Sequence, residues 1–216
     1  MSQFYDELTA EIQEFIREQP VFFTATAPAE GRINLSPKGM DTFRILDERT
    51  VAYLDITGSG NETATHLREN GRITLMFCSF GPVARIVRIY GNGRVVRPCD
   101  AQWNELHRHF PAYPGERQIM KIAVGSAMTS CGYGVPRMKL VARRDTLEDY
   151  WIKKGPGAAE KYWGIHNLRS IDGLDSGILD PSDGNSTPRG TAADRASKPH
   201  RPQLVRPARD LRSRKA

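Results

Sequence analysis

Apolar and polar residues follow two different periods along the chain, and the change of period predicts the secondary structure. Near the N-terminus, Phe4, Leu8, Ile12 and Phe15 recur at helical spacing, and Pro20 ends the predicted helix. From there the period shortens to two, and β-branched and aromatic residues become frequent, which is typical of strands. Strands are predicted over 20–27, 32–36, 50–56, 72–80, 84–96 and 117–128.

Helices are predicted between and after these strands. Residues 61–70 form one candidate, which Gly71 would end, and residues 100–110 form another, for which Asp100 is a suitable N-cap. A final pair is predicted over 145–154 and 158–167, separated by a Gly-Pro-Gly turn.

These elements predict the fold class. Most strands follow one another directly, whereas a doubly wound sheet would need a helix between most of them. Gly91 and Gly93 lie inside one predicted strand, where they indicate a bulge or a barrel corner. The chain is therefore predicted to be mainly β with flanking helices, as an antiparallel barrel.

Charge separates the chain into a body and a tail. The domain is predicted over 1–175 and a disordered basic tail over 176–216, because the tail has too few large apolar residues to offset its chain entropy. Residues 181–216 hold nine Lys or Arg and three Asp or Glu, whereas 1–180 hold 22 of each sign. A nucleic-acid partner is therefore not expected for the body; for the tail, a solvated segment and a contact with nucleic acid or an acidic membrane both stay open.

Other features narrow the function classes. No apolar run approaches the length of a membrane span, and the acidic N-terminus resembles no targeting peptide, so a cytoplasmic protein without a membrane partner is expected. Cys78, Cys99 and Cys131 are far apart and predict neither a disulfide framework nor a zinc site. His107 and His109 point to different faces of a helix, so no metal site is expected.

The segment 50–72 holds the clearest candidate chemistry. A strand is followed by Gly58-Ser59-Gly60 and then by a helix, so free backbone N–H groups and the positive end of the helix dipole would converge on the turn. Such a turn suits a phosphate group, and Thr57, Ser59, Asn61 and Thr63 add side-chain donors. Simple capping of the helix by Asn61 is an equal alternative. A dinucleotide fingerprint is not indicated, because Thr63 stands at its third glycine position.

A second candidate is Lys38, which follows a strand and a Ser-Pro bend. Pro37 is expected to end the regular ladder and to redirect the chain. The lysine is either a partner for a phosphate or an ordinary surface lysine in a loop.

Three stretches of the sequence together resemble a known family. The stretch FFTATAPAEGRINLSPKGMDTFRILDERTVAYLDITGSGNETATHLRENGRITLMF, with SCGYGVP at 130–136 and NLRSIDGL at 167–174, resembles the pyridoxamine 5′-phosphate oxidase-like family of FMN-binding split barrels. The resemblance implies a split β-barrel, a homodimer, and one FMN at each interface. It places Ser36, Pro37 and Lys38 beside the flavin, and Thr57, Asn61, Glu62 and Thr63 at the FMN phosphate.

The chain departs from the family at one point. Many relatives carry an Arg-Lys pair where this chain has Glu62 and Thr63, and a carboxylate near a phosphate is unfavourable. The phosphate would then need Lys38, the helix N–H groups and Arg85 or Arg88.

The resemblance implies an FMN-dependent oxidoreductase acting on an unknown small-molecule substrate or electron donor, with no catalytic side chain assigned. The alternative is a non-enzymatic flavin or haem binder on the same barrel, and deazaflavin could replace FMN. Oxidation of pyridoxamine phosphate itself is not expected, because the oxidase's C-terminal substrate-binding segment is missing. Tyr133 could stack on a flavin or pack as an ordinary aromatic, and Cys131 is expected to have no chemical role.

Overall fold

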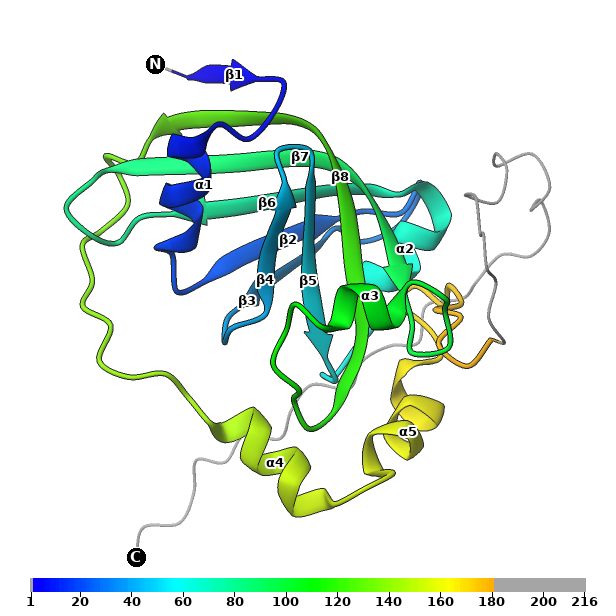
Figure 1. Ribbon diagram of the computed structural model, residues 1–216. Helices are drawn as coiled ribbons and strands as arrows, with labels where there is room; N and C mark the ends of the chain where they lie inside the picture. Colours follow the sequence, from blue (N-terminus) through cyan, green and yellow to red (C-terminus); the bar gives the residue numbers. More distant parts are fainter. Residues whose placement is uncertain (1, 181–216) are drawn as a thin grey trace, which may run out of the picture.

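The computed structural model describes residues 2–180, which form one antiparallel sheet of eight strands with short helices around it (Figure 1). The strands are β1 (Gln3–Tyr5), β2 (Phe22–Thr26), β3 (Asn34–Lys38), β4 (Phe43–Asp47), β5 (Thr50–Ile56), β6 (Arg72–Cys78), β7 (Arg85–Val96) and β8 (Glu116–Cys131). The helices are α1 (Ala10–Arg17), α2 (Glu62–Asn70), α3 (Trp103–His107), α4 (Thr146–Lys154) and α5 (Ala158–Tyr162), and α5 continues into a π-helical turn, Trp163–Asn167. The predicted mainly β fold with flanking helices is confirmed.

The strand order is β3-β2-β6-β7-β8-β5-β4, and β1 pairs with β8. The long strands β7 and β8 form the middle of the sheet, which curves into a split barrel whose outer strands are β3 and β4 (Figure 1). The predicted bulge lies between Tyr90 and Gly91. A Cβ at Gly91 would approach the Ala123 carbonyl oxygen to 2.5 Å, so this close crossing of two backbones requires glycine.

The core fills the barrel and one of its ends. Apolar side chains of α1 contribute to the main cluster together with inward-facing residues of β2, β5, β6, β7 and β8, so the amphipathic helix closes the barrel. A second cluster holds α3 against β5 and β8 through Trp103, Leu106 and Ile119. Burial in these two clusters fixes the orientation of β5, the strand that leads to the candidate turn.

Several predicted boundaries were wrong. Phe4 lies in β1 opposite Met128, so the first helix begins only after Thr9, whose hydroxyl accepts from the Ile12 N–H. Strand β4 was missed because its residues are mostly half-buried and show no clear alternation. Pro37 does not end β3 but lies within it opposite Phe23, which is tolerated because β3 is an edge strand.

Two helices also differ from the prediction. Helix α3 is shorter than 100–110, and its N-cap is Gln102. Asp100 instead accepts the Arg97 N–H through its side chain and the Trp103 N–H through its carbonyl. The predicted helix 158–167 is divided between α5 and the π-helical turn.

The last described residues pack on the barrel. Of the predicted tail, residues 176–180 are described: Ile178 is buried, and the Ser176 hydroxyl donates to the Asn167 carbonyl at 2.5 Å. The rest of the predicted tail, 181–216, lies outside the described residues. Within 2–180, no helix is long and apolar enough to cross a membrane, and all three cysteines are free.

Candidate functional site

The turn after β5 lies where the sequence placed it. Strand β5 ends at Ile56, the Gly58-Ser59-Gly60 turn follows, and α2 begins at Glu62. Helix α2 ends at Asn70, and Gly71 is its C-cap, with φ 72° and its N–H donated to the Leu67 carbonyl. Because α2 begins directly after the turn, the free N–H groups at its start face the turn, where the helix dipole favours negative charge.

A cavity of about 310 Å³ opens beside this turn. Three parts of the chain that are distant in sequence form its wall, namely the edge strand β3, the end of β5 with the turn and the start of α2, and the start of β8. Its lining residues are Asn34, Ser36, Pro37, Lys38, Asp55, Ile56, Gly58, Ser59, Gly60, Asn61, Glu62, Thr63 and Arg117. Six of the seven predicted site residues thus line one cavity.

Thr57 is the predicted residue that the cavity leaves out. Its side chain is buried, and its hydroxyl accepts a hydrogen bond from Trp163 Nε1 at 2.7 Å. Its carbonyl accepts another from Trp151 Nε1 at 3.1 Å. Because both tryptophans come from the C-terminal helices, sequence spacing could not show that Thr57 faces away from the cavity.

Asp55 is the centre of a charge network in the cavity wall. Its carboxylate is 2% exposed and accepts from Arg117 Nε at 3.0 Å and Nη2 at 2.6 Å, and from Gln118 Nε2 at 3.0 Å. Its other oxygen accepts from Lys38 Nζ at 3.0 Å. Burial alone would raise the pKa of this carboxyl, but Arg117 and Lys38 outweigh burial and hold the pKa well below its usual range. One buried anion therefore faces two cations, which leaves positive charge for a ligand.

Neither Asp55 nor Arg117 was a sequence-based candidate. Each lies in a predicted strand. Asp55 is a charged residue within an otherwise apolar run, whereas Arg117 begins its strand between Glu116 and Gln118, so no local signal marked it. Lys38, in contrast, was proposed because it follows a predicted Ser-Pro bend; it is instead the last residue of β3, and it does line the cavity.

Asn61 contributes an unused hydrogen-bond donor. The residue is at the N-cap of α2, but its side chain makes no capping bond, so the simple capping alternative is not what the structure shows. Its Oδ1 accepts from Gln118 Nε2 at 2.6 Å, whereas its buried Nδ2 has no hydrogen-bond partner among the described residues. An unpaired buried donor costs about 1–3 kcal/mol, so a ligand with an acceptor atom at this position would be favoured.

The two residues that replace the family's Arg-Lys pair have partners of their own. The Glu62 carboxylate accepts the Ile171 N–H at 3.0 and 3.2 Å, and Thr63 Oγ1 accepts from Asn34 Nδ2 at 3.0 Å. Glu62 therefore binds the segment of residues 163–172, which we call the strap.

The strap is held to the turn by further contacts. Asn167 Nδ2 donates to the Gly58 carbonyl at 3.3 Å, and Asn167 Oδ1 accepts from Arg117 Nη1 at 2.8 Å. The same Arg117 nitrogen donates to the Gly60 carbonyl at 3.1 Å. Arg117 thus ties the charge network, the turn and the strap together.

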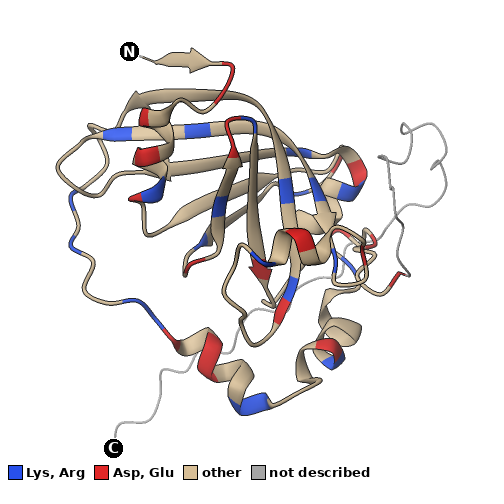
Figure 2. Cartoon of the chain, viewed as in Figure 1, with Lys and Arg blue, Asp and Glu red and all other residues tan. Residues whose placement is uncertain are grey.

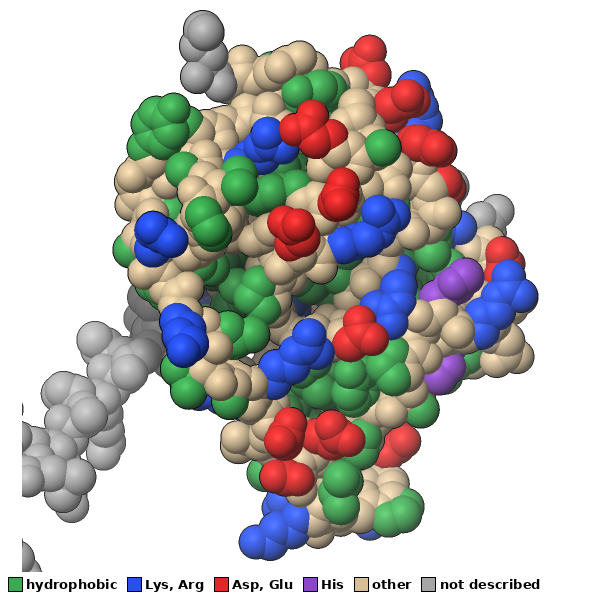
Figure 3. Space-filling model, turned by 60° about the vertical axis from the view of Figure 1, so that its left-hand side comes forward, with side chains coloured by type: hydrophobic (Ala, Val, Ile, Leu, Met, Phe, Trp, Pro, Cys, Tyr) green, Lys and Arg blue, Asp and Glu red, His purple; other side chains and the backbone are tan. Residues whose placement is uncertain are grey.

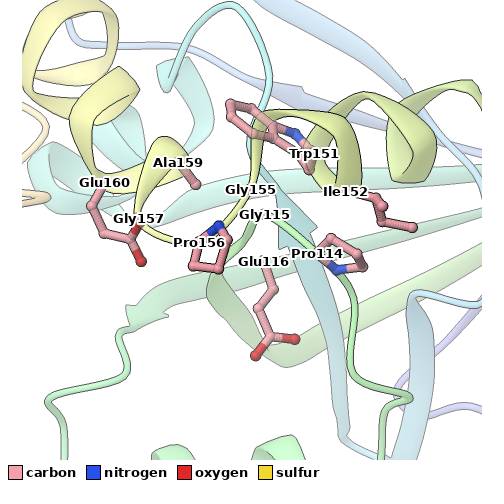
Figure 4. A pocket seen from close by; sticks show the side chains of 10 residues that line it. All are labelled: Pro114, Gly115, Glu116, Trp151, Ile152, Gly155, Pro156, Gly157, Ala159 and Glu160. Atoms are coloured by element: carbon pink, nitrogen blue, oxygen red, sulfur yellow. The ribbon is translucent and has the colours of Figure 1, made fainter.

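A larger cavity of about 460 Å³ lies between the start of β8 and the α4–α5 segment (Figure 4). Its charged lining residues are Glu116 and Glu160, and it includes none of the predicted site residues. Glu116 already accepts from the Tyr113 N–H and pairs with His107 Nε2 at 3.0 Å. Without a cation in its lining, this cavity suits a phosphate less than the smaller one.

The remaining sequence candidates lie outside the smaller cavity. Arg85 pairs with Glu11, and Arg88 donates to the Ser130 hydroxyl, so neither supplies the cavity's second cation; Arg117 does. Cys131 and Tyr133 are exposed. No group of three or more His, Cys, Asp or Glu that could hold a metal ion occurs among residues 2–180.

Comparisons with known proteins agree with this fold. The family model of pyridoxamine 5′-phosphate oxidase matches residues 8–131. A curated relative, the pyridoxamine 5′-phosphate oxidase family protein ustO of Aspergillus flavus, is 36% identical over 194 residues, which is 81% of this chain and 77% of the relative.

Solved structures show more distant similarity. HupZ of Group A Streptococcus is 22% identical with a TM-score of 0.43, over 54% of this chain and 88% of that one. The FAD-binding protein of Mycobacterium smegmatis is 13% identical with a TM-score of 0.42, over 59% of this chain and 97% of that one. The match of the family model over more than half of the chain, together with the curated relative, shows that the chain belongs to the pyridoxamine 5′-phosphate oxidase family.

Proposed function

We propose that this chain binds FMN in the cavity beside the turn after β5 and acts as an FMN-dependent oxidoreductase of the cytoplasm. The observation that carries the proposal is the cavity itself: Lys38, the unpartnered Nδ2 of Asn61 and the N-terminus of α2 line one space. Together they offer a cation, a side-chain donor and backbone donors, which is the donor set that a phosphate prefers.

The charge network of Lys38, Asp55 and Arg117 supports an anionic ligand. Asp55 neutralises one of its two cationic neighbours, so the charge network is positive by one unit. The Glu62 carboxylate, which also lines the cavity, cancels this unit in the formal charge of the lining, but it is oriented by the Ile171 N–H of the strap, so the proposal depends on where the donors lie and not on net charge. A phosphate would bind at Lys38, Asn61 and the start of α2.

The small size of the cavity favours a second subunit that completes the FMN site. At about 310 Å³, it is at the small end of the range for ligand pockets, roughly 300–1,000 Å³. We therefore propose a homodimer, in which the partner subunit covers the part of FMN that extends beyond the cavity. When bound, FMN would supply the redox chemistry, and this chain would bind and orient it.

A haem fits the cavity less well than a flavin. No His, Cys, Met or Tyr is among its lining residues, so the described chain offers no usual axial ligand there. A non-enzymatic flavin binder remains the second candidate, and reduction of the bound flavin by a nicotinamide cofactor separates it from an oxidoreductase.

The test is a titration of FMN and of riboflavin, which lacks the phosphate, against the wild type and three variants. Lys38→Ala removes a charge-assisted contact of about 1.5–3 kcal/mol, so FMN should bind about 10- to 150-fold more weakly, and riboflavin far less so. Asn61→Asp keeps the acceptor for Gln118 but replaces the free donor with an anion, and should also weaken FMN more than riboflavin. The control is Lys161→Ala, an exposed lysine of α5 that does not line the cavity.

Two results would overturn the proposal. Equal losses of FMN and riboflavin in Lys38→Ala would mean that Lys38 supports the ring or the fold. A purified protein that binds no flavin, or that shows a Soret band when supplied with haem instead, would exclude FMN as the resident cofactor.

A further inference from the structure

An extended segment leaves the barrel after β8 and makes almost no contact with it. Residues 136–145, which we call the arm, run between the end of β8 and the start of α4, outside the sheet (Figure 1). Every residue of the arm is exposed. Among the described residues, the one backbone hydrogen bond from the arm to the barrel is Met138 N–H to the Phe80 carbonyl, at 2.9 Å.

The arm exposes large apolar side chains. Met138 is 60% exposed, Leu140 59% and Val141 92%. Holding a chain extended costs about 1–2 kcal/mol of backbone entropy per residue, and within the described subunit the Met138 hydrogen bond offsets little of that cost for the arm. Burial of these side chains against another molecule would offset it.

The arm is also strongly cationic. Four cations lie within eight residues of the arm, namely Arg137, Lys139, Arg143 and Arg144. The arm contains no acidic residue before its last residue, Asp145. No ion pair joins these four side chains to the rest of residues 2–180. Blue segments mark the arm in Figure 2, and Figure 3, which brings that side forward, shows cationic side chains standing among hydrophobic ones.

The same subunit carries a surface of opposite charge. Seven exposed carboxylates surround α1 and the β4–β5 turn, and this acidic face consists of Asp6, Glu7, Glu11, Glu14, Glu18, Asp47 and Glu48. The two parts of the face are adjacent, since the Leu8 N–H donates to the Glu48 carbonyl at 2.9 Å. Among its members, Glu7 and Glu11 pair with Arg49 and Arg85, so the face keeps a net negative charge.

We propose that the arm docks on the acidic face of a second copy of this chain. In a two-fold dimer the contact would occur twice, because each subunit has one arm and one acidic face. The inference rests on the homodimer of the proposed function and names the elements that form it. The arm's cations would meet unpaired carboxylates, and its apolar side chains would be covered at the same contact.

A second copy fits better than a nucleic acid or an anionic membrane. Residues 1–180 hold equal numbers of acidic and basic residues, so the body has no net positive charge that would attract a polyanion. The acidic face would repel a polyanion, whereas it matches the arm of another subunit.

The experiment measures the subunit dissociation constant by analytical ultracentrifugation of the full chain. Arg143→Glu with Arg144→Glu should raise that constant about tenfold or more at low salt, because like charges then face one another. Adding Glu14→Arg and Glu18→Arg to the same chain restores opposite charges and should restore dimerisation. The control, Lys153→Glu with Lys161→Glu, reverses two exposed cations outside the arm and should leave the constant unchanged.

Each result other than the expected one leads to a different conclusion about the arm and the dimer. A dimer that withstands the arm reversal overturns the arm contact but not the homodimer, and a monomeric wild type overturns both. Wild type that binds duplex DNA or phosphatidylserine vesicles through Arg143 and Arg144 without dimerising assigns the arm to another partner and also overturns the inference. FMN content measured on the same samples tests the flavin proposal separately.

Discussion

Removal of the Arg117 guanidinium should destabilise the fold more than any change to an exposed ion pair. Arg117→Met keeps most of the side-chain bulk but leaves the Asp55 carboxylate, 2% exposed, with Lys38 and Gln118 as its partners. Breaking a buried pair on one side typically costs about 3–5 kcal/mol. Lys38 still compensates part of the charge, so we expect about 3 kcal/mol, or a fall in melting temperature of roughly 6–12 °C for a chain of this length.

The pH dependence of that loss follows from the pKa of Asp55. Because the folded carboxyl has a pKa below its usual 3.8, its contribution to stability is fully present above that value and is lost as the pH falls through the lower, folded pKa. In Arg117→Met, we expect the pKa of Asp55 in the folded state to rise toward or above 3.8. The stability gap between wild type and variant should therefore shrink as the pH is lowered below about 4.

The assay is urea unfolding at pH 7 and at stepwise lower pH. The double variant Asp55→Asn with Arg117→Met removes the orphaned charge and should be more stable than Arg117→Met alone. Arg49→Gln is the control, since its 3.4 Å pair with Glu7 is exposed on both sides and should contribute about 0–0.5 kcal/mol. A loss in Arg117→Met as small as that of the control, or a gap that widens in acid, would refute the reasoning.

Three further predictions concern the strap, a buried histidine and a helix end. Trp163→Phe removes the hydrogen bond to the Thr57 hydroxyl and should cost about 1 kcal/mol in urea unfolding; no loss would mean that the strap is not held there. Burial lowers the pKa of His66, so as the pH falls the unfolded chain takes up a proton before the folded chain does, and the free energy of unfolding should fall below about pH 6.5. His66→Gln should abolish this pH dependence of stability. An unchanged pH dependence would assign the effect to another group. Gly71→Ala should cost more than about 1 kcal/mol of stability, because φ is 72° and the new Cβ would lie 2.5 Å from Asn92 Nδ2. The control, Gly134→Ala, has open space around it and should be nearly neutral. Equal melting temperatures of the two variants would contradict the argument.

The residues of β5 and α2 show how far the local pattern reaches. The apolar run of 50–56 predicted β5 with its observed ends, and Gly71 predicted the end of α2. These features depend on neighbours in sequence, namely on which face of a short segment is apolar and on where only glycine tolerates the backbone. The same locality misled the prediction at Phe4, whose helical spacing to Leu8 was overridden by pairing of β1 with β8.

The sequence by itself determined the antiparallel β class, the Gly-rich turn before a helix and, through the family resemblance, the role expected of Lys38. Only the tertiary structure decided which groups meet at that turn. Asp55 and Arg117 are 62 positions apart and become partners because β5 pairs with β8. Thr57 is withdrawn from the cavity by Trp163, 106 positions away. Periodicity reports that a residue is buried, whereas its partner depends on strand order and on the path of the chain after β8, which no local pattern contains.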